Sequence, residues 1–199
     1  MIPTRMNPMG TAAYSKRLNY LAVAQSGQYI ITDYEFDARN KGSSLEIKFY
    51  MPSDMDPNKG IFGARATASA ADSLYCLGRN LVVGGESDFQ AYNVFTTGAD
   101  NVLIFEDGKF SVNGSAETDT GRLPAVNGYA FDLFNMNLRG NHSFASSTGT
   151  RIYYCKFFEN GSLVRNFIPV LDRYGVPCMF DTVTKNRFYN AGAGTFDYA

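Results

Sequence analysis

The chain has 199 residues, the size of one large β domain, and 45% of them are apolar, which is enough for a full core without disulfides or metals. Its 18 basic and 19 acidic side chains give a net charge of −1, so we expect neither nucleic acid nor a membrane surface as a partner. No apolar stretch approaches the roughly 20 residues that span a bilayer. The segment 1–9 lacks the continuous apolar block of a secretory signal.

The composition favours short β-strands. The chain contains 16 Phe and 13 Tyr but no Trp, and aromatic side chains favour pleated surfaces. Its 19 Gly favour tight turns between strands. Segment 1–16, rich in Pro, Gly and polar residues, is predicted to be an N-terminal arm or linker, and residues 17–199 a single domain.

The clearest predicted strand is Leu45–Met51. Apolar residues alternate along it with Glu46, Lys48 and Tyr50. This period of two puts the apolar side chains on one face of a half-buried strand, whereas a helix would spread them around its surface.

Shorter strands are predicted along the rest of the chain, at Leu18–Ala22, Gln28–Thr32, Ile61–Arg65, Ser73–Leu77, Leu81–Gly84, Gln90–Phe95, Asn101–Glu106, Lys109–Val112, Gly128–Asn137, Arg151–Phe158, Leu163–Val170, Val176–Asp181 and Arg187–Tyr189. Asp107-Gly108, Asn113-Gly114 and Asn160-Gly161 are typical two-residue turns between such strands. No segment shows a helical stripe of ten or more residues. We therefore predict an all-β fold of two packed antiparallel sheets.

Three cysteines, Cys76, Cys155 and Cys178, lie far apart among apolar or aromatic neighbours. Their number is odd, and they show none of the short spacings of metal or redox sites. We predict that they are buried free thiols. A disulfide between two of them is the alternative.

The last fifty residues carry a recognisable pattern. From Asn160 the chain reads Asn-Gly-Ser-Leu-Val-Arg-Asn-Phe-Ile-Pro-Val-Leu-Asp, from Gly175 Gly-Val-Pro-Cys-Met-Phe-Asp, and from Phe188 Phe-Tyr-Asn-Ala-Gly-Ala-Gly. This resembles the C-terminal signature of the LamG-like, concanavalin A-like jelly-roll domains of phage or prophage structural proteins and gut bacterial surface proteins. Tyr20-Leu21 and Ser26–Ile30 resemble the opening strand of the same family. The resemblance brackets residues 18–197 and implies a two-sheet jelly-roll sandwich.

Most residues of this pattern have structural explanations. We predict that Phe167, Ile168, Val176, Met179 and Phe180 fill the space between the sheets. Arg165 is expected to pair with either Asp172 or Asp181, and the sequence does not show which.

The sequence shows few residues that could act in catalysis. The chain has one histidine, His142, in the polar loop Gly140–Gly149, where we expect it to be solvated. A Ser-His-Asp arrangement would have to use it, yet no nucleophile elbow accompanies it. One histidine with scattered cysteines also disfavours a zinc site. We predict that the protein is not an enzyme.

The strongest catalytic alternative is Asp33-Tyr34-Glu35-Phe36-Asp37. If extended, this segment places Asp33, Glu35 and Asp37 on one face, as in the acidic strand of jelly-roll β-glucanases. The order Asp-Glu-Asp, the position just after the opening strand and the absence of Trp argue against a glycosidase. The same three carboxylates are candidate ligands of a structural calcium ion; otherwise no cofactor is expected.

Four tyrosines are candidate platforms for a sugar ring: Tyr92, Tyr129, Tyr153 and Tyr154. The leading functional hypothesis is a virion component of a phage, such as a capsid decoration, fibre or tail protein. It would dock on other virion proteins through the N-terminal arm, form a homo-oligomer and bind a glycan ligand. The alternatives are a carbohydrate-binding module of a bacterial surface or secreted protein, and a glycosidase.

Overall fold

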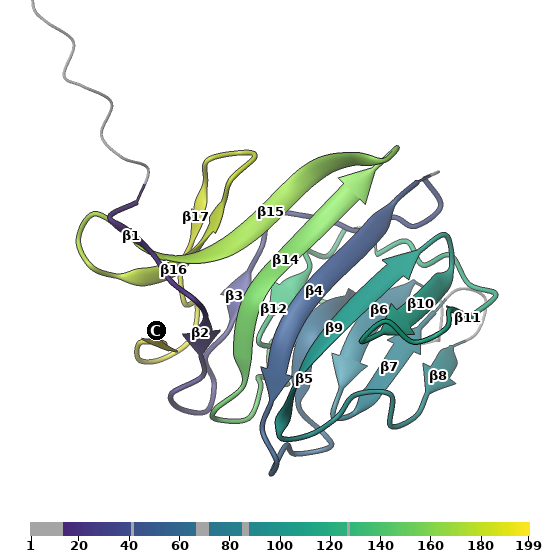
Figure 1. The fold of residues 1–199 in the computed structure, drawn as a ribbon, viewed down its shortest axis with the longest axis horizontal. Coiled ribbons are helices and arrows are strands. Elements are labelled where there is room, and N and C mark those ends of the chain that lie inside the picture. Colours follow the sequence, from purple (N-terminus) through teal and green to yellow (C-terminus); the bar gives the residue numbers. More distant parts are fainter. Residues whose placement is uncertain (1–13, 41, 67–71, 85–87, 127) are drawn as a thin grey trace, which may run out of the picture.

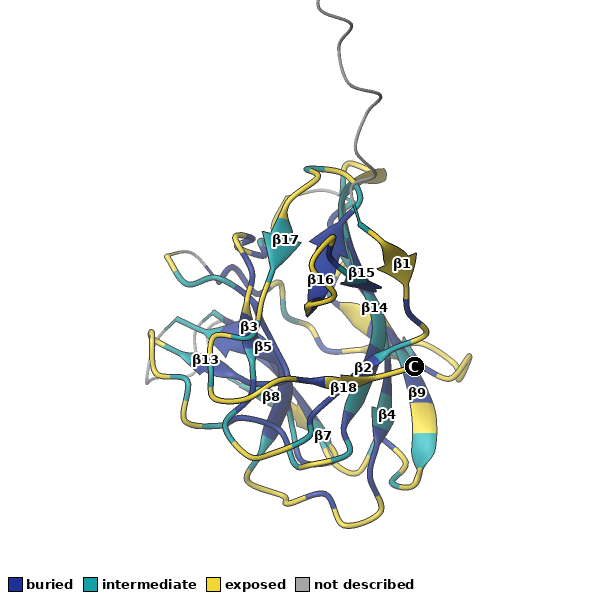
Figure 2. Cartoon of the chain, turned by 90° about the vertical axis from the view of Figure 1, so that its left-hand side faces the viewer, coloured by how far each residue is buried: buried dark blue, intermediate teal, exposed yellow. Residues whose placement is uncertain are grey.

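The structure is a computed structural model that describes residues 14–40, 42–66, 72–84, 88–126 and 128–199. Two layers of strands face each other, with β3, β5 and β8 on one side and β14, β4 and β9 on the other (Figures 1 and 2). Across the described ranges there is no helix, and therefore none long and apolar enough to cross a bilayer.

The larger sheet has eleven strands within the described residues. Its main order is β11 (Thr118–Asp119), β10 (Lys109–Val112), β9 (Ala99–Glu106), β4 (Ser44–Met51), β14 (Arg151–Glu159), β15 (Ser162–Leu171), β16 (Pro177–Asp181) and β17 (Arg187–Phe188). Three short strands join it, namely β1 (Lys16–Arg17), β2 (Leu21–Ala22) and β18 (Asp197–Tyr198). Strand β2 pairs with both β14 and β18.

The smaller sheet has seven strands in the same ranges. Its order is β3 (Ile30–Ile31), β12 (Asp132–Leu133), β5 (Gly60–Arg65), β6 (Ser73–Leu77), β7 (Asn80–Val83) and β8 (Phe89–Ala91), and β13 (Asn137–Leu138) pairs with β5. The β13–β5 pairing is parallel, and the other pairings of the described strands are antiparallel. The chain is thus an all-β, two-sheet antiparallel sandwich of the jelly-roll kind, as the sequence predicts.

Aromatic side chains fill the space between the sheets. In β4, Leu45, Ile47, Phe49 and Met51 are fully buried while the residues between them are half-buried, which confirms the predicted alternation. Phe49 from the larger sheet contacts Phe62 from the smaller one, with ring centroids 5.7 Å apart.

The predicted two-residue turns are confirmed by their backbone angles. Asp107 and Gly108 have φ of 47° and 76° and join β9 to β10. Asn160 and Gly161, at 50° and 71°, join β14 to β15. Positive φ at both positions is what a type I′ turn requires. The cysteine prediction is confirmed too, because Cys76, Cys155 and Cys178 are free and buried.

Several predicted strands are shorter than expected. Leu18–Ala22 forms only β2, and Gln28–Thr32 forms only β3. Strand β8 ends at Ala91 rather than near Phe95, and Gly128–Asn137 forms only β12 and the start of β13. Phe134 interrupts that segment with a φ of 62°, which no strand accommodates.

The C-terminal pattern fills the core only in part. Phe167 and Met179 lie between the sheets, as predicted. Their neighbours Ile168 and Phe180 are buried instead in a separate cluster, because successive strand residues point to opposite faces. Val176 was predicted to be buried but is 43% exposed, in the turn before β16.

The structure also identifies the partner of Arg165. Its Nε atom lies 3.5 Å from Oδ2 of Asp181 and 3.3 Å from Oδ1 of Asp33. Asp172 binds the main-chain N–H groups of Tyr174 and Val176 instead.

The first described residues are attached to the larger sheet. Lys16 pairs with Leu171 of β15, and the ring of Tyr14 packs edge-on against Phe180 at 5.2 Å. At the other end, the main-chain N–H of Asn19 donates to the carbonyl of Ala199 (2.5 Å). Most of the predicted arm, residues 1–13, lies outside the described residues.

Candidate functional site

The acidic segment has the alternation that the sequence predicts. Tyr34 and Phe36 are buried, Asp33 and Glu35 are exposed, and Asp37 is half-buried. The carboxylates therefore point away from the core, as an extended segment requires.

Each carboxylate has a different partner. Asp33 pairs with Arg165 (3.3 Å), Glu35 accepts a hydrogen bond from the main-chain N–H of Gly128 (2.7 Å), and Asp37 binds Arg39 through both carboxylate oxygens (3.0 Å each). The hydrogen bonds from Arg39 lower the pKa of Asp37. Within the described ranges, the structure brings no three Asp, Glu, His or Cys side chains together as a metal site. The structural calcium ion stays a prediction for these residues, and glycosidase activity stays the disfavoured alternative.

A β-bulge in β14 sets the geometry of Tyr153 and Tyr154. Ile152 pairs with Phe49 and Tyr154 with the very next residue back, Lys48, so that Tyr153 is the extra residue. In a regular strand one of two adjacent side chains would enter the core. Here both tyrosines are half-buried on the outer side of the larger sheet, between the fully buried Ile152 and Cys155.

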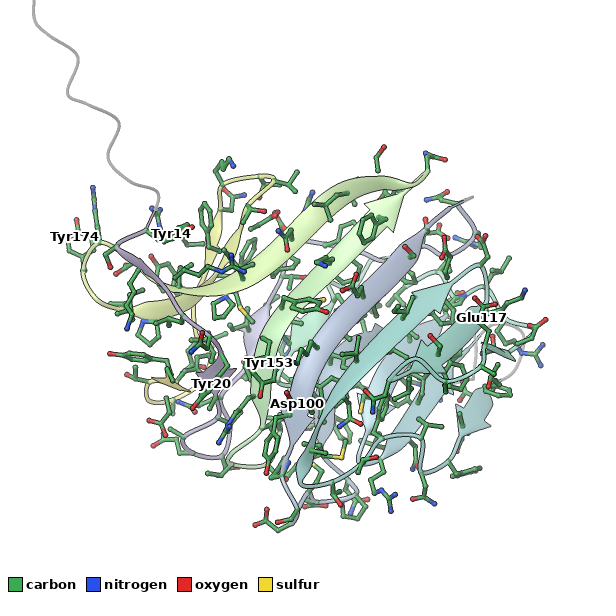
Figure 3. The ribbon with its side chains drawn as sticks, viewed as in Figure 1. Tyr14, Tyr20, Asp100, Glu117, Tyr153 and Tyr174 are labelled. Atoms are coloured by element: carbon green, nitrogen blue, oxygen red, sulfur yellow. The ribbon has the colours of Figure 1, made fainter. Side chains whose placement is uncertain are left out.

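Charged side chains surround these two rings. The Tyr153 hydroxyl donates to Oδ1 of Asp100 (2.7 Å), whose Oδ2 pairs with Lys48 (3.2 Å). The Lys48 ammonium lies 4.7 Å from the centre of the Tyr153 ring. Burial and the bond to Asp100 raise the pKa of Tyr153 to about 12, so its hydroxyl stays a donor at neutral pH. Tyr20 packs edge-on against Tyr153 at 5.9 Å. Figure 3 shows Tyr20, Tyr153 and Asp100 together over the larger sheet.

A second unit of the same kind lies along β14. The Lys156 ammonium is 4.5 Å from the centre of the Tyr154 ring and 3.0 Å from Oε1 of Glu46. Burial and a hydrogen bond with Glu46 raise the pKa of Tyr154. The rings and ammonium groups thus hold one another in place by cation–π contacts.

Tyr20 and Tyr50 complete the surface. The guanidinium of Arg151 lies between them, 4.7 Å and 4.8 Å from the two ring centres. We call this surface the tyrosine face: Tyr20, Tyr50, Tyr153 and Tyr154 with Lys48, Arg151, Lys156, Asp100 and Glu46. A sugar-binding site combines aromatic rings, on which the sugar ring stacks, with polar groups that form hydrogen bonds with its hydroxyls. The tyrosine face offers both.

The other two candidate tyrosines lie elsewhere in the fold. Tyr92 follows β8 at the edge of the smaller sheet and is 68% exposed. Tyr129 is half-buried in the loop before β12. The structure therefore unites Tyr153 and Tyr154, and adds Tyr20 and Tyr50, which sequence analysis missed. The alternation in β4 indicates that Glu46, Lys48 and Tyr50 point to the outer face of the sheet. It does not show that β4 lies beside β14, because the order of strands in a sheet is not visible in the sequence.

His142 is not the solvated side chain that the sequence suggests. Its Nδ1 atom lies 2.7 Å from Oδ2 of the fully buried Asp132, and its ring stacks on Tyr29 at 5.0 Å. The Asn135 side chain donates to the same oxygen (2.7 Å). The expectation fails because the loop folds back over β12, which brings His142 to a buried carboxylate.

This buried carboxylate leads to a prediction about pH. Burial raises the pKa of Asp132 to about 6, against the lowering effect of hydrogen bonds from His142 and Asn135. The folded state therefore favours protonated Asp132, and its stabilising contribution is lost as the pH rises through 6. We expect the free energy of unfolding to increase as the pH falls from 7 to 5, by at most about 1.4 kcal/mol per pH unit. Urea unfolding of the protein and of Asp132→Asn measures this.

The Asp132→Asn variant should lack most of that slope, since an amide does not titrate. Equal slopes in the two proteins would contradict the assignment to Asp132. Asp37 and Asp172, whose pKa values are lowered by their hydrogen bonds, act in the opposite direction, but only at more acidic pH.

Comparisons of the chain with known proteins find similarity only among solved structures. No protein-family model matches it, and no curated protein matches it. Similar solved structures include NanB with Optactamide (TM-score 0.46, 15% identity, covering 72% of this chain and 26% of that one). A mutant of the NanB sialidase from Streptococcus pneumoniae is also similar (TM-score 0.45, 13% identity, covering 72% of this chain and 27% of that one). So is the same sialidase in complex with a chlorobenzylammonio-ethanesulfonate (TM-score 0.42, 14% identity, with the same two coverages). The chain spans about a quarter of the length of these neighbours. At this level the likeness gives no information on activity.

Proposed function

We propose that this chain is a non-catalytic accessory protein that binds carbohydrate through the tyrosine face. The β-bulge at Ile152–Tyr154 carries this proposal, because it turns two adjacent tyrosines outward on the central strand of the larger sheet. Each ring has a cation over it and its hydroxyl faces a carboxylate, so both are pre-oriented before a ligand arrives. Pre-orientation lowers the entropic cost of binding.

Replacing Tyr153 with alanine is expected to weaken glycan binding by about tenfold or more, the usual effect of removing a central aromatic contact. A glycan array followed by titration of the best ligand measures this. Tyr174→Ala is the matched control, because Tyr174 is 74% exposed and lies in the turn between β15 and β16. If both variants bind as the unmodified protein does, or if no glycan binds at all, the tyrosine face is not the site.

We place the protein on a phage virion, as a capsid decoration, fibre or tail component. This part rests on the resemblance of residues 151–197 to LamG-like domains of phage structural proteins. The arm, residues 1–16, would dock on another virion protein, and the sandwich would assemble as a homo-oligomer. Mass spectrometry of purified particles tests it, and particles without this chain would exclude the virion role.

A carbohydrate-binding module of a bacterial surface or secreted protein would use the same tyrosine face. The resemblance includes such proteins as well. Capsid and tail genes beside the coding gene would favour the virion, and glycan-utilisation genes would favour the bacterial surface.

A further inference from the structure

The charges of the tyrosine face do not cancel. Lys48 pairs with Asp100 at 3.2 Å, and Lys156 with Glu46 at 3.0 Å. The ion pairs between described residues do not include Arg151. Three cations and two carboxylates therefore leave one positive charge, and Arg151 is the cation without a carboxylate partner.

The surroundings of Arg151 fix its position without neutralising it. In the pairing of β14 with its neighbours, Arg151 lies opposite Tyr50 of β4 and Ala22 of β2. The rings of Tyr20 and Tyr50 lie 4.7 Å and 4.8 Å from its guanidinium carbon. Its polar neighbour is the hydroxyl of Tyr153, which is uncharged. Aromatic rings hold a guanidinium by cation–π contact but leave its N–H groups able to donate.

We propose that Arg151 binds the carboxylate of an acidic sugar whose ring stacks on the adjacent tyrosines, so that the protein selects carboxylated glycans over neutral ones. This inference rests on the proposed glycan-binding function and names its substrate class. A guanidinium and a carboxylate match as two planar groups that form two parallel hydrogen bonds. Lys48 and Lys156 are less suited, because each would first have to leave its own carboxylate.

The experiment compares each acid with its own neutral form. Oligogalacturonate, alginate oligomers and hyaluronan fragments are printed beside their methyl esters, and binding of the complete chain is measured. We expect at least about a tenfold preference for each bound acid over its ester, the effect of one charge-assisted contact. In Arg151→Gln, the preference for the acid over its ester should be lost, because binding of the acid falls much more than binding of the ester.

Two further variants separate contact from folding. Arg151→Lys keeps the charge and loses the planar fork, so its preference should be intermediate. Lys109→Gln removes a cation of β10 that is paired with Glu117, outside the tyrosine face, and should leave the preference for the acid unchanged. Thermal unfolding of all three variants shows whether the sheet is intact.

Several results would overturn the inference while leaving glycan binding in place. Equal binding of acids and esters is one, and so is equal loss of both in Arg151→Gln, which would mean that Arg151 only positions the tyrosines. A sulfated galactan that binds as tightly as the acids would remove the selectivity for carboxylates. Failure of the proposed function looks different, because then neither acids, esters nor neutral glycans bind.

Discussion

Replacing Phe157 with alanine is expected to lower the free energy of unfolding by about 3–5 kcal/mol, because the side chain leaves a cavity that its rigid neighbours do not fill. Phe157 is fully buried on β14. Its ring lies 4.5 Å from that of Tyr34, 5.0 Å from Phe131, 5.8 Å from Phe36 and 6.3 Å from Phe167, measured between centroids. One side chain thus joins both layers of the sandwich.

Urea denaturation with linear extrapolation measures this loss. Ile104→Ala is the control, since Ile104 lies in the same sheet but is 43% exposed and should cost less than about 0.5 kcal/mol. A loss below about 1 kcal/mol for Phe157→Ala would contradict the central position of this ring.

Gly63→Ala is expected to destabilise the fold by more than about 3 kcal/mol, enough to prevent a marginally stable domain from folding. Gly63 lies in β5 with a φ of 123°, a conformation that alanine adopts only under strain. An added Cβ would also overlap the main chain of Leu74 and Tyr75 in β6. Because these atoms belong to the main chain, a change of side-chain rotamer cannot relieve the overlap. The strands β5 and β6 would have to move apart.

Gly175→Ala separates the two causes. Gly175 also has a positive φ, of 80°, but nothing lies within 4 Å of the position of its Cβ. This variant should lose only the backbone strain of about 1–2 kcal/mol. Soluble yield and thermal unfolding of both variants are the measurements. Equal stability would show that β6 is not packed against Gly63 as described.

Local patterns were sufficient to predict much of the fold. The alternation in Leu45–Met51 identified β4 and its buried face, and the Asp-Gly and Asn-Gly pairs identified the hairpin turns. These features depend on residues adjacent in the chain. The buried state of the cysteines followed from their apolar neighbours.

The candidate site was only partly predictable, because its contacts join distant segments. The sequence predicts Tyr153 and Tyr154 as candidate platforms for a sugar ring, but only a bulge against β4 turns both outward. Arg151 is a candidate binding residue because it lies between Tyr20 and Tyr50. These two tyrosines are 30 residues apart in sequence, and both flank β14 only in the folded sheet. His142 contacts Asp132 across a segment in which Phe134 and Arg139 both have positive φ, and these backbone turns have no pattern in the sequence. None of these features has a sequence pattern of its own.

The position of β2 has a consequence for how the sandwich can be built into larger polypeptides. It lies between β14 and β18, and the main-chain N–H of Asn19 donates to Ala199, so the segment that enters β2 lies beside the last residues of the described chain. Compact units whose ends adjoin can be inserted into a surface loop of a host protein, or circularly permuted, with little distortion. Entry at Asn19 and exit at Ala199 would then lie side by side on the larger sheet.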